Sequence, residues 1–384
     1  MGKASTCLAD FHAFVTAQPS ACALVHHDRD AGSSIQLTYR DLADMAVAAG
    51  LGLHEAGLHR GCPIVSFCDE SPAVVIAFLG IASAGGVVVP IDPAAPEARL
   101  QSMIADCGAR LALCVCEWKE ALESKVCGHE ERLHLVTLEA AMRAGRMRTC
   151  HESSMLPLPQ PDDHLHLIYT SGSTGRPKAV LVTHGAMHAY ARAKCNAHGI
   201  QPALSGAYAS ACASRVLLAS AHTWDPCIGD TLSTLAAGAT LCTAPRAQLL
   251  QAFGGTMQAL RVTHVCATPS LWSLLSLAPS QLPSLQFVAL GGEALPFALV
   301  APWLAHSASA ATGLPSGLPV IANTYGVTEV TVYQTIGACA TAEARGTASA
   351  GWPFASVDLA LDTALDTALE AALEAALVFA SPAL

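Results

Sequence analysis

Short apolar runs alternate with segments of helical periodicity along the chain from residue 35 onward. Such alternation is typical of βαβ units, in which helices cover mostly parallel sheets. The runs that suit buried strands cover residues 63–67, 111–115, 133–136, 262–267 and 285–290. The pattern therefore predicts an α/β protein with mostly parallel sheets.

One helix start can be placed closely from the sequence. Thr38 is a suitable N-cap, and Asp41 stands three residues later, which is the spacing of a capping box. The apolar residues that follow share one face of a helix. Gly50 and Gly52 then predict the end of this helix, because glycine is common just after a helix.

Hydrophobic residues make up 52% of the chain and charged residues 13%, which excludes a disordered protein. The best candidate for a membrane span is the uncharged run Ala73–Ile91. Gly85 and Gly86 interrupt this run and Pro90 closes it, so a buried helix, a turn and a short strand are expected instead of a span. The net charge of −10 has the wrong sign for a phosphate backbone, so nucleic acid is not an expected partner.

Fifteen cysteines are scattered along the chain without a C-x-x-C pair. Their odd number and their spacing predict neither a disulfide framework nor a zinc site. Several stand in apolar runs, where a free thiol packs as a small hydrophobic group, and this favours a reducing, cytoplasmic setting. His164 and His166 fall on one face of a predicted strand, and a polar strand face is favoured over a metal site because no third ligand is nearby.

The start of the chain lacks the apolar stretch of a signal peptide but matches the loose pattern for myristoylation on Gly2. An ordinary disordered start is the favoured interpretation, because the pattern is short. A polar, proline-rich linker at 151–161 is expected to separate subdomains at about 34–150 and 162–345. Residues 357–384 repeat acidic and leucine positions every four residues, which favours a low-complexity insertion of marginal helicity over an interaction helix.

The most informative motif places a loop of glycine, serine and threonine between two apolar strands. Backbone N–H groups in such a loop can point at an anion, the hydroxyls add donors, and Lys178 adds a positive charge. A Walker A loop is excluded, because Ala179 and further strand residues follow the lysine where a helix would have to begin. The residues of this predicted phosphate-binding loop are Thr170, Ser171, Gly172, Ser173, Thr174, Gly175 and Lys178.

This segment resembles the phosphate-binding signature of the adenylate-forming superfamily, which includes acyl-CoA synthetases, luciferases and adenylation domains of nonribosomal peptide synthetases. Other stretches resemble the family's motifs in the same order, over about residues 35–356. The resemblance is strongest to the amino-acid adenylation domains. It implies that residues 1–356 form the N-terminal core of the acyl-adenylate synthetase fold, with two βαβ-type subdomains and a partial β-barrel-like region. The matching stretches begin at Leu37, Gly85, Trp224, Gly238, Gly291 and Asn323.

The family resemblance implies a ligase reaction. A carboxylate attacks the α-phosphate of ATP bound with Mg²⁺, pyrophosphate leaves, and the acyl-adenylate later passes to a thiol on a carrier protein or coenzyme A. The implied catalytic residues are Lys178, Thr328 and Glu329, with Thr328 at the α-phosphate and Glu329 as the Mg²⁺ ligand. The implied contacts to adenine are a stacked Tyr325, the side chain of Asn323, and the backbone of Gly292 and Glu293.

Asp225 bears on the type of carboxylate. In family members that activate amino acids, an aspartate after an aromatic residue pairs with the α-ammonium group, and Trp224-Asp225-Pro226 resembles that arrangement. The alternative is an aspartate that caps a helix ahead of Pro226. The other implied pocket residues are mostly small, which implies room for a sizeable side chain. They are Pro226, Gly229, Ala267, Ala289, Gly291, Thr324, Val332 and Tyr333.

Family members continue through a ribose-binding aspartate, a hinge and a mobile C-terminal subdomain whose lysine contacts the reacting carboxylate. None of these is recognised in this sequence, so a truncated adenylation domain with impaired activity is expected. A catalytically inactive nucleotide-binding fragment and a member similar to acyl- or aryl-CoA ligases are the alternatives.

Overall fold

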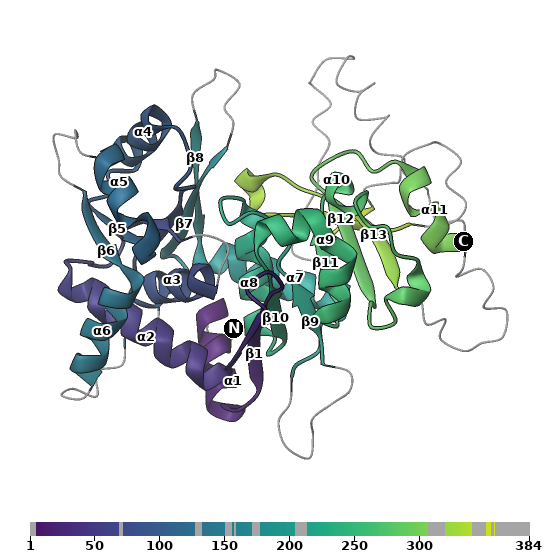
Figure 1. Cartoon of the computed structure of the whole chain (residues 1–384), viewed down its shortest axis with the longest axis horizontal. Coiled ribbons are helices and arrows are strands. Elements are labelled where there is room, and N and C mark those ends of the chain that lie inside the picture. The colour runs from purple at the N-terminus through teal and green to yellow at the C-terminus, as the bar shows by residue number, and fades with distance from the viewer. Residues whose placement is uncertain are drawn as a thin grey trace.

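The computed structural model describes residues 5–68, 72–126, 133–149, 156, 159–170, 177–203, 213–305, 319–339, 351–354 and 357. Within these residues the strands form two open sheets with helices packed against them, and no closed barrel (Figure 1). The predicted α/β class is confirmed, whereas the implied barrel-like region is not seen in the described part of the chain.

The six-stranded sheet has the strand order β6-β5-β3-β4-β7-β8, and only its last pair is antiparallel. Its strands are β3 (Pro63–Phe67), β4 (Val87–Pro90), β5 (Leu111–Cys114), β6 (His134–Thr137), β7 (His164–Thr170) and β8 (Lys178–Thr183). The helices on this side of the molecule are α2 (Tyr39–Glu55), α3 (Pro72–Ser83), α4 (Glu97–Cys107), α5 (Lys119–Val126), α6 (Leu138–Thr149) and the short 3₁₀ helix η1 (Cys116–Trp118). The apolar runs predicted at the first three strand positions therefore form strands.

The nine-stranded sheet has the order β15-β14-β13-β12-β11-β9-β10-β1-β2, with a parallel centre and antiparallel edges. Its strands are β1 (Cys22–Asp28), β2 (Ser33–Thr38), β9 (Arg215–Leu217), β10 (Thr240–Thr243), β11 (His264–Ala267), β12 (Phe287–Gly291), β13 (Val320–Tyr325), β14 (Thr335–Ala338) and β15 (Trp352–Pro353). The remaining helices are α1 (Cys7–Ala17), α7 (His184–His198), α8 (Asp225–Ala236), α9 (Arg246–Ala259), α10 (Pro269–Trp272), η3 (Pro279–Gln281), α11 (Phe297–Ala305) and η5 (Thr328–Val330).

The two sheets do not follow the expected subdomain boundaries. β1 and β2 stand early in the chain yet pair at the edge of the nine-stranded sheet, next to β10. β7 and β8 follow the expected linker at 151–161 yet complete the six-stranded sheet. Parallel pairing with strands that are distant in the sequence thus decides which sheet each of these strands joins. The local composition of a strand does not indicate that pairing. Of the repeat expected at 357–384, only Val357 belongs to the described residues.

α2 begins with the predicted capping box, in which the Asp41 backbone N–H donates to Thr38 Oγ1 over 3.1 Å. The predicted end at Gly50 and Gly52 is wrong, because α2 continues beyond both glycines. Their role is close helix packing: a Cβ on Gly52 would lie 1.9 Å from the carbonyl oxygen of Ala141 in α6. Gly50 meets α3 in the same way, so tertiary contact outweighs the low helix propensity of glycine.

The uncharged run Ala73–Ile91 has the predicted form. It consists of α3, a turn in which Gly85 adopts φ +81°, and the short strand β4. Among the described helices none is both long enough and apolar enough to cross a bilayer.

The two histidines of β7 do not share a polar strand face. His164 is exposed, whereas His166 is fully buried, and the pairing of β7 with β8 shifts register between them. Burial lowers the pKa of His166 to about 3, so its imidazole is neutral at physiological pH.

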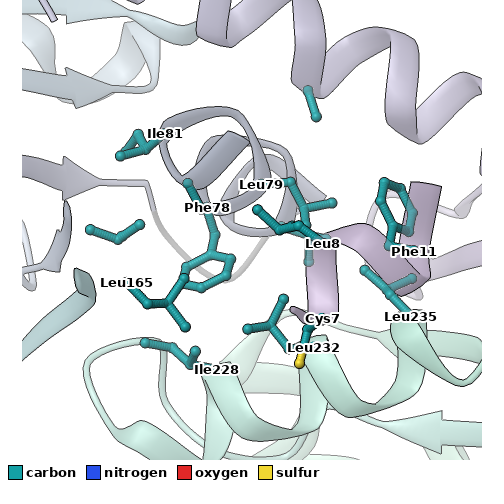
Figure 2. Close-up of a cluster of buried hydrophobic side chains, with 14 of the residues drawn as sticks. Cys7, Leu8, Phe11, Phe78, Leu79, Ile81, Leu165, Ile228, Leu232 and Leu235 are labelled. Carbon is teal, nitrogen blue, oxygen red and sulfur yellow. The ribbon is translucent and has the colours of Figure 1, made fainter. Parts of the chain in front are cut away.

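One hydrophobic cluster connects the two sheets (Figure 2). Phe11 from α1, Leu79 from α3 and Ile228 and Leu232 from α8 meet in it, each no more than 3% exposed. Full burial of such side chains contributes about 1.5–3 kcal/mol each. This packing fixes α8 between the sheets, and Asp225 is the first residue of that helix.

Candidate functional site

The predicted site residues gather at the carboxyl ends of strands from both sheets. Thr170 ends β7, Gly291 ends β12 and Tyr325 ends β13, while Asp225 opens α8. The carboxyl edge of a parallel sheet is where ligands usually bind in α/β proteins. The topology therefore supports a ligand site at this edge.

The two ends of the predicted phosphate-binding loop are adjacent in the structure. Thr170 pairs with Lys178 across the β7–β8 hairpin. Lys178 Nζ lies 3.4 Å from Oε1 of Glu329, and the two side chains are 64% and 43% exposed. A pair this exposed contributes at most about 1 kcal/mol, so both charges are free to exchange this contact for a ligand. The loop residues outside the described part of the chain are Ser171, Gly172, Ser173, Thr174 and Gly175.

The segment after β13 folds back tightly on itself. A Cβ on Gly326 would lie 2.2 Å from the carbonyl oxygen of Val332, so only glycine fits there. The Gln334 side chain accepts from the Val327 backbone N–H over 2.8 Å and fixes the turn. Thr331 and Val332 both adopt positive φ, at 69° and 68°. This conformation is strained for a β-branched residue, and such strain is found most often at functional sites.

Three consecutive residues at the end of β13 differ in what they can contact. Tyr325 is 57% exposed, so its ring is accessible for stacking. Thr324 is buried, and its hydroxyl donates to the carbonyl oxygen of Thr335 over 2.7 Å. Asn323 is buried and faces the opposite side of the sheet from Thr324, because side chains alternate along a strand.

The turn after β12 contains the two other predicted adenine contacts. Gly292 adopts φ +82°, and a Cβ there would lie 2.7 Å from the indole of Trp224. The Glu293 carboxylate accepts from Ser270 twice, from its hydroxyl over 2.5 Å and from its backbone N–H over 3.1 Å. The Glu293 side chain is thus engaged with α10, which leaves the backbone of this turn for a ligand.

Asp225 is not the cap of α8. Trp224 stands at the N-cap position without a side-chain capping bond, and Asp225 and Pro226 are the first helical residues. The capping alternative is therefore wrong. Asp225 is only 3% exposed, and among the described residues its Oδ2 has no hydrogen-bond partner.

The surroundings of Asp225 show which groups lie close to it. Burial raises the pKa of the Asp225 carboxyl to about 6, the Thr328 hydroxyl and the Val332 backbone oppose this rise, and the charge of Glu329 adds to it. Residues from α8 and from the segment after β13 therefore meet at one carboxylate. A buried carboxylate with an unpartnered oxygen is a suitable partner for a cationic group.

The register of the central strands shows which residues share a face. Ala289 of β12 pairs with Cys266 of β11 and with Ala322 of β13, so these three side chains point to the same side. Ala267 points to the other side, where it packs in a separate cluster with Leu290. The structure therefore does not bring Ala267 together with the other predicted substrate residues. Cys266, and not Ala267, lies on the face of the sheet that carries Ala289. Both faces of β11 are buried, so no polar alternation in the sequence could have marked this difference.

Two tyrosine rings lie close to glycines of the predicted pocket. A Cβ on Gly229 would lie 2.9 Å from Cε1 of Tyr190 and 3.2 Å from Cγ2 of Val332. A Cβ on Gly291 would lie 3.1 Å from Cε1 of Tyr333. Both tyrosines are buried. Gly229 and Gly291 therefore add no free space of their own, and the expectation of room for a sizeable side chain stays a prediction.

A buried ion pair joins the two helices α7 and α8 beside the candidate pocket. Lys194 of α7 bonds to Asp230 of α8, and both side chains are 1% exposed. The second carboxylate oxygen of Asp230 has no partner among the described residues. Nothing in the sequence pattern singles out this pair, because its members are distant in the chain and belong to no motif.

The described residues contain no group of three or more histidine, cysteine, aspartate or glutamate side chains that could hold a metal ion. Mg²⁺, however, is usually bound by one or two carboxylates together with phosphate oxygens and water. The exposed Glu329 carboxylate beside the predicted phosphate-binding loop fits that requirement.

Comparison with known proteins places these features in a family context. The profile of the AMP-binding family, described as AMP-binding enzyme, matches residues 11–369. The nonribosomal peptide synthetase ungA of Aspergillus violaceofuscus is 30% identical over 320 residues, which cover 83% of this chain and 3% of that protein. Nonribosomal peptide synthetase 4 of Gibberella zeae is 32% identical over 307 residues, which cover 78% of this chain and 4% of that protein. The chain thus spans only about 3–4% of the length of these relatives.

Solved structures share the fold. The nonribosomal peptide synthetase FmoA3 superposes with a TM-score of 0.73 at 24% identity, covering 91% of this chain and 34% of that chain. The N-terminal subdomain of Klebsiella oxytoca NpsA, in complex with 3-hydroxybenzoyl-AMSN, gives a TM-score of 0.72 at 21% identity, covering 90% of this chain and 79% of that chain. The fold is therefore that of the N-terminal part of such proteins.

Proposed function

Because this chain belongs to the AMP-binding enzyme family, we propose that it activates an amino acid as an aminoacyl-adenylate, with ATP as co-substrate and pyrophosphate as product. One observation carries the proposal: a buried carboxylate, Asp225, has an unpartnered oxygen at the edge where both sheets end. Structural relatives support it. FmoA3 has been solved with AMPPNP and with α-methyl-L-serine-AMP, and VinN has been solved with L-aspartate.

Asp225 would bind the α-ammonium group of the amino acid. An ionised carboxylate held in a buried site is costly unless a cation pairs with it, and the substrate supplies that cation. The Thr328 hydroxyl and the Val332 backbone already favour the ionised form of Asp225. Substrates without an ammonium group would leave this charge unpaired, so the site would discriminate against simple carboxylic and aryl acids.

The exposed end of the site would bind the nucleotide. Lys178 and the loop that it follows would neutralise the β- and γ-phosphates, and Thr328 would contact the α-phosphate. Tyr325 would stack on the adenine, because its ring is exposed at the end of β13. Glu329 would hold Mg²⁺, which when bound supplies further positive charge to the phosphates.

Catalysis would follow from positioning and charge. The amino-acid carboxylate attacks the α-phosphorus of ATP, the bond to the β-phosphate oxygen breaks, and pyrophosphate leaves with its electrons. The residues of this chain contribute by holding the two reactants in line and by stabilising charge on the leaving group. Transfer of the aminoacyl group to a thiol of a carrier protein or coenzyme A would complete the reaction of the family.

Amino-acid-dependent ATP–pyrophosphate exchange, measured over a panel of amino acids and aryl acids, tests this proposal. We expect exchange with at least one amino acid and its loss in Asp225→Asn. ATP binding without exchange for any acid would contradict the enzymatic function and favour a nucleotide-binding fragment. Exchange with aryl acids alone would contradict the role of Asp225 and favour a ligase of aryl acids.

A further inference from the structure

Two buried tyrosines from different elements lie beside the glycines of the candidate pocket. Tyr190 comes from α7, and Tyr333 comes from the segment between η5 and β14. The Tyr190 ring stands where a side chain at Gly229 would project, with Cε1 2.9 Å from the Cβ position. The Tyr333 ring lies 3.1 Å from a Cβ at Gly291, behind Thr324, whose backbone oxygen and Cγ2 lie at 2.4 and 2.6 Å. Glycine at position 229 therefore accommodates the Tyr190 ring, and glycine at position 291 accommodates Thr324 of the neighbouring strand, with the Tyr333 ring close by.

Each of the two tyrosines contacts a neighbouring side chain that holds it in place. Tyr190 meets Phe354 edge to face, with ring centroids 6.2 Å apart and an interplanar angle of 77°. The Phe354 backbone N–H donates to the carbonyl oxygen of Gln334 over 2.8 Å, which anchors this contact. The Tyr333 hydroxyl interacts with the Cys266 thiol, whose pKa burial raises to about 12. Close packing of this kind leaves the rings little freedom to move aside.

The helix geometry directs a bound amino acid toward these rings. Asp225 and Gly229 are one turn apart on α8, so they lie on the same face of the helix. Tyr190 borders this face, and the charges of Asp230, Cys266 and Asp225 add to the effect of burial in raising the pKa of its hydroxyl well above the usual value. A substrate whose ammonium group binds Asp225 would therefore extend its side chain toward Tyr190, Val332 and Tyr333.

We infer that this pocket accepts amino acids with small side chains, of the size of glycine, alanine or serine, and that Tyr190 and Tyr333 exclude larger ones. The inference rests on the proposed function, in which Asp225 binds the α-ammonium group. A benzyl or indole side chain would have to displace packed rings, and overpacking of this kind is strongly unfavourable. The expected discrimination against phenylalanine is about 10- to 100-fold in affinity.

Equilibrium binding of aminoacyl sulfamoyl-adenosines to the full chain, measured by calorimetry, tests the inference. The probes carry glycyl, alanyl, seryl, phenylalanyl and tryptophanyl groups. We expect the alanyl compound to bind about 10- to 100-fold more tightly than the phenylalanyl compound. Tyr333→Ala and Tyr190→Ala should reduce this preference by about tenfold or more, because each removes a ring. Tyr333→Phe and Tyr190→Phe keep the ring, and they should leave the preference unchanged.

Tyr333→Leu and Tyr190→Leu replace the alanine variants if those do not fold, as judged by thermal melting. Equal affinity for the phenylalanyl and alanyl compounds in the unaltered chain would overturn the size limit while leaving the proposed function intact. A preference that survives removal of both rings in folded variants would overturn the role of the tyrosines. Binding of ATP but of none of the aminoacyl compounds would overturn the proposed function, and the size limit with it.

Discussion

The two ends of the candidate site differ in how they are built. The end at Asp225 is buried, lies on a helix held by the core that joins the two sheets, and is lined by packed side chains. The end at Lys178, Tyr325 and Glu329 is exposed, and its side chains make only a weak surface ion pair. The buried end is therefore organised before any ligand binds, whereas the exposed end gains its order from the ligand.

This contrast separates specificity from nucleotide binding. Side chains already fixed by packing lose little entropy when a substrate binds, so small differences in substrate shape have large effects there. Exposed long side chains lose rotamer freedom on binding, and charge attraction has to outweigh that loss. Substitutions at the buried end should consequently alter stability and substrate choice, and substitutions at the exposed end should alter nucleotide affinity alone.

The largest effect is expected from breaking the buried ion pair behind the pocket. Lys194→Met leaves the Asp230 carboxylate buried without a cation, and the free energy of unfolding should fall by about 3–5 kcal/mol. Urea denaturation measures this change. The double variant Lys194→Met with Asp230→Leu removes both charges and should recover most of the loss. A single variant as stable as the unaltered chain would show that the pair is not buried as described.

Asp225→Asn should have the next largest effect, and it should act on substrate binding. The amide keeps the shape of the side chain but removes the charge that would bind the ammonium group, so affinity for alanyl sulfamoyl-adenosine should fall about 30-fold or more. Affinity for ATP, measured in the same titration format, should stay within about threefold, because ATP has no ammonium group. An equal fall for both ligands would contradict the separation of the two ends.

Binding at the buried end of the site should depend on pH. The pKa of Asp225 is raised to about 6, so protonation below that pH removes the charge that the substrate needs. Affinity for alanyl sulfamoyl-adenosine should fall by up to about tenfold per pH unit below pH 6, and this dependence should be absent in Asp225→Asn.

The free energy of unfolding should change with pH in the opposite direction. A carboxyl whose pKa is raised in the folded state destabilises that state when it ionises, so the free energy of unfolding should fall as the pH rises from about 4 to 6. Chemical denaturation across that range measures this contribution, again with Asp225→Asn as the control.

The smallest of these effects is expected at the exposed end. Lys178→Ala removes a charge that would bind the β- and γ-phosphates, so ATP affinity should fall about tenfold. Alanyl sulfamoyl-adenosine lacks those phosphates, and its affinity should not change. Lys178→Arg keeps the charge and should retain most of the ATP affinity. Unchanged ATP affinity in Lys178→Ala would contradict the phosphate-binding assignment.

Much of the fold could be predicted from the sequence because its signals are local. The capping box at Thr38 and Asp41 begins α2, and the uncharged run Ala73–Ile91 divides into a helix, a turn and a strand. The end of α2 could not be predicted, because Gly52 is required by contact with Ala141, which is distant in the sequence. The prediction of which strands share a sheet failed for the same reason, because pairing between strands that are distant in the sequence decides it.

The candidate site shows the same limit at the level of single residues. Asp225 could be singled out as a candidate from the sequence, because its neighbours in the chain form a motif, and its role in the site stays a prediction. Cys266 could not be distinguished from Ala267, because both faces of β11 are buried. Tyr190 could not be predicted, because it reaches the pocket from another helix and belongs to no motif. Residues that belong to no local motif, such as Tyr190 and the charged pair Lys194 and Asp230, are therefore hard to find from sequence whether they fill space or carry charge.

Two ligands can test whether Asp225 binds the ammonium group of an amino acid. Alanyl sulfamoyl-adenosine and its propionyl analogue differ only in the α-ammonium group, so their binding to the full chain isolates that contact. We expect the alanyl compound to bind about 30-fold or more tightly than the propionyl compound, and the difference to disappear in Asp225→Asn. Equal affinities for the two compounds in the unaltered chain would contradict this role of Asp225.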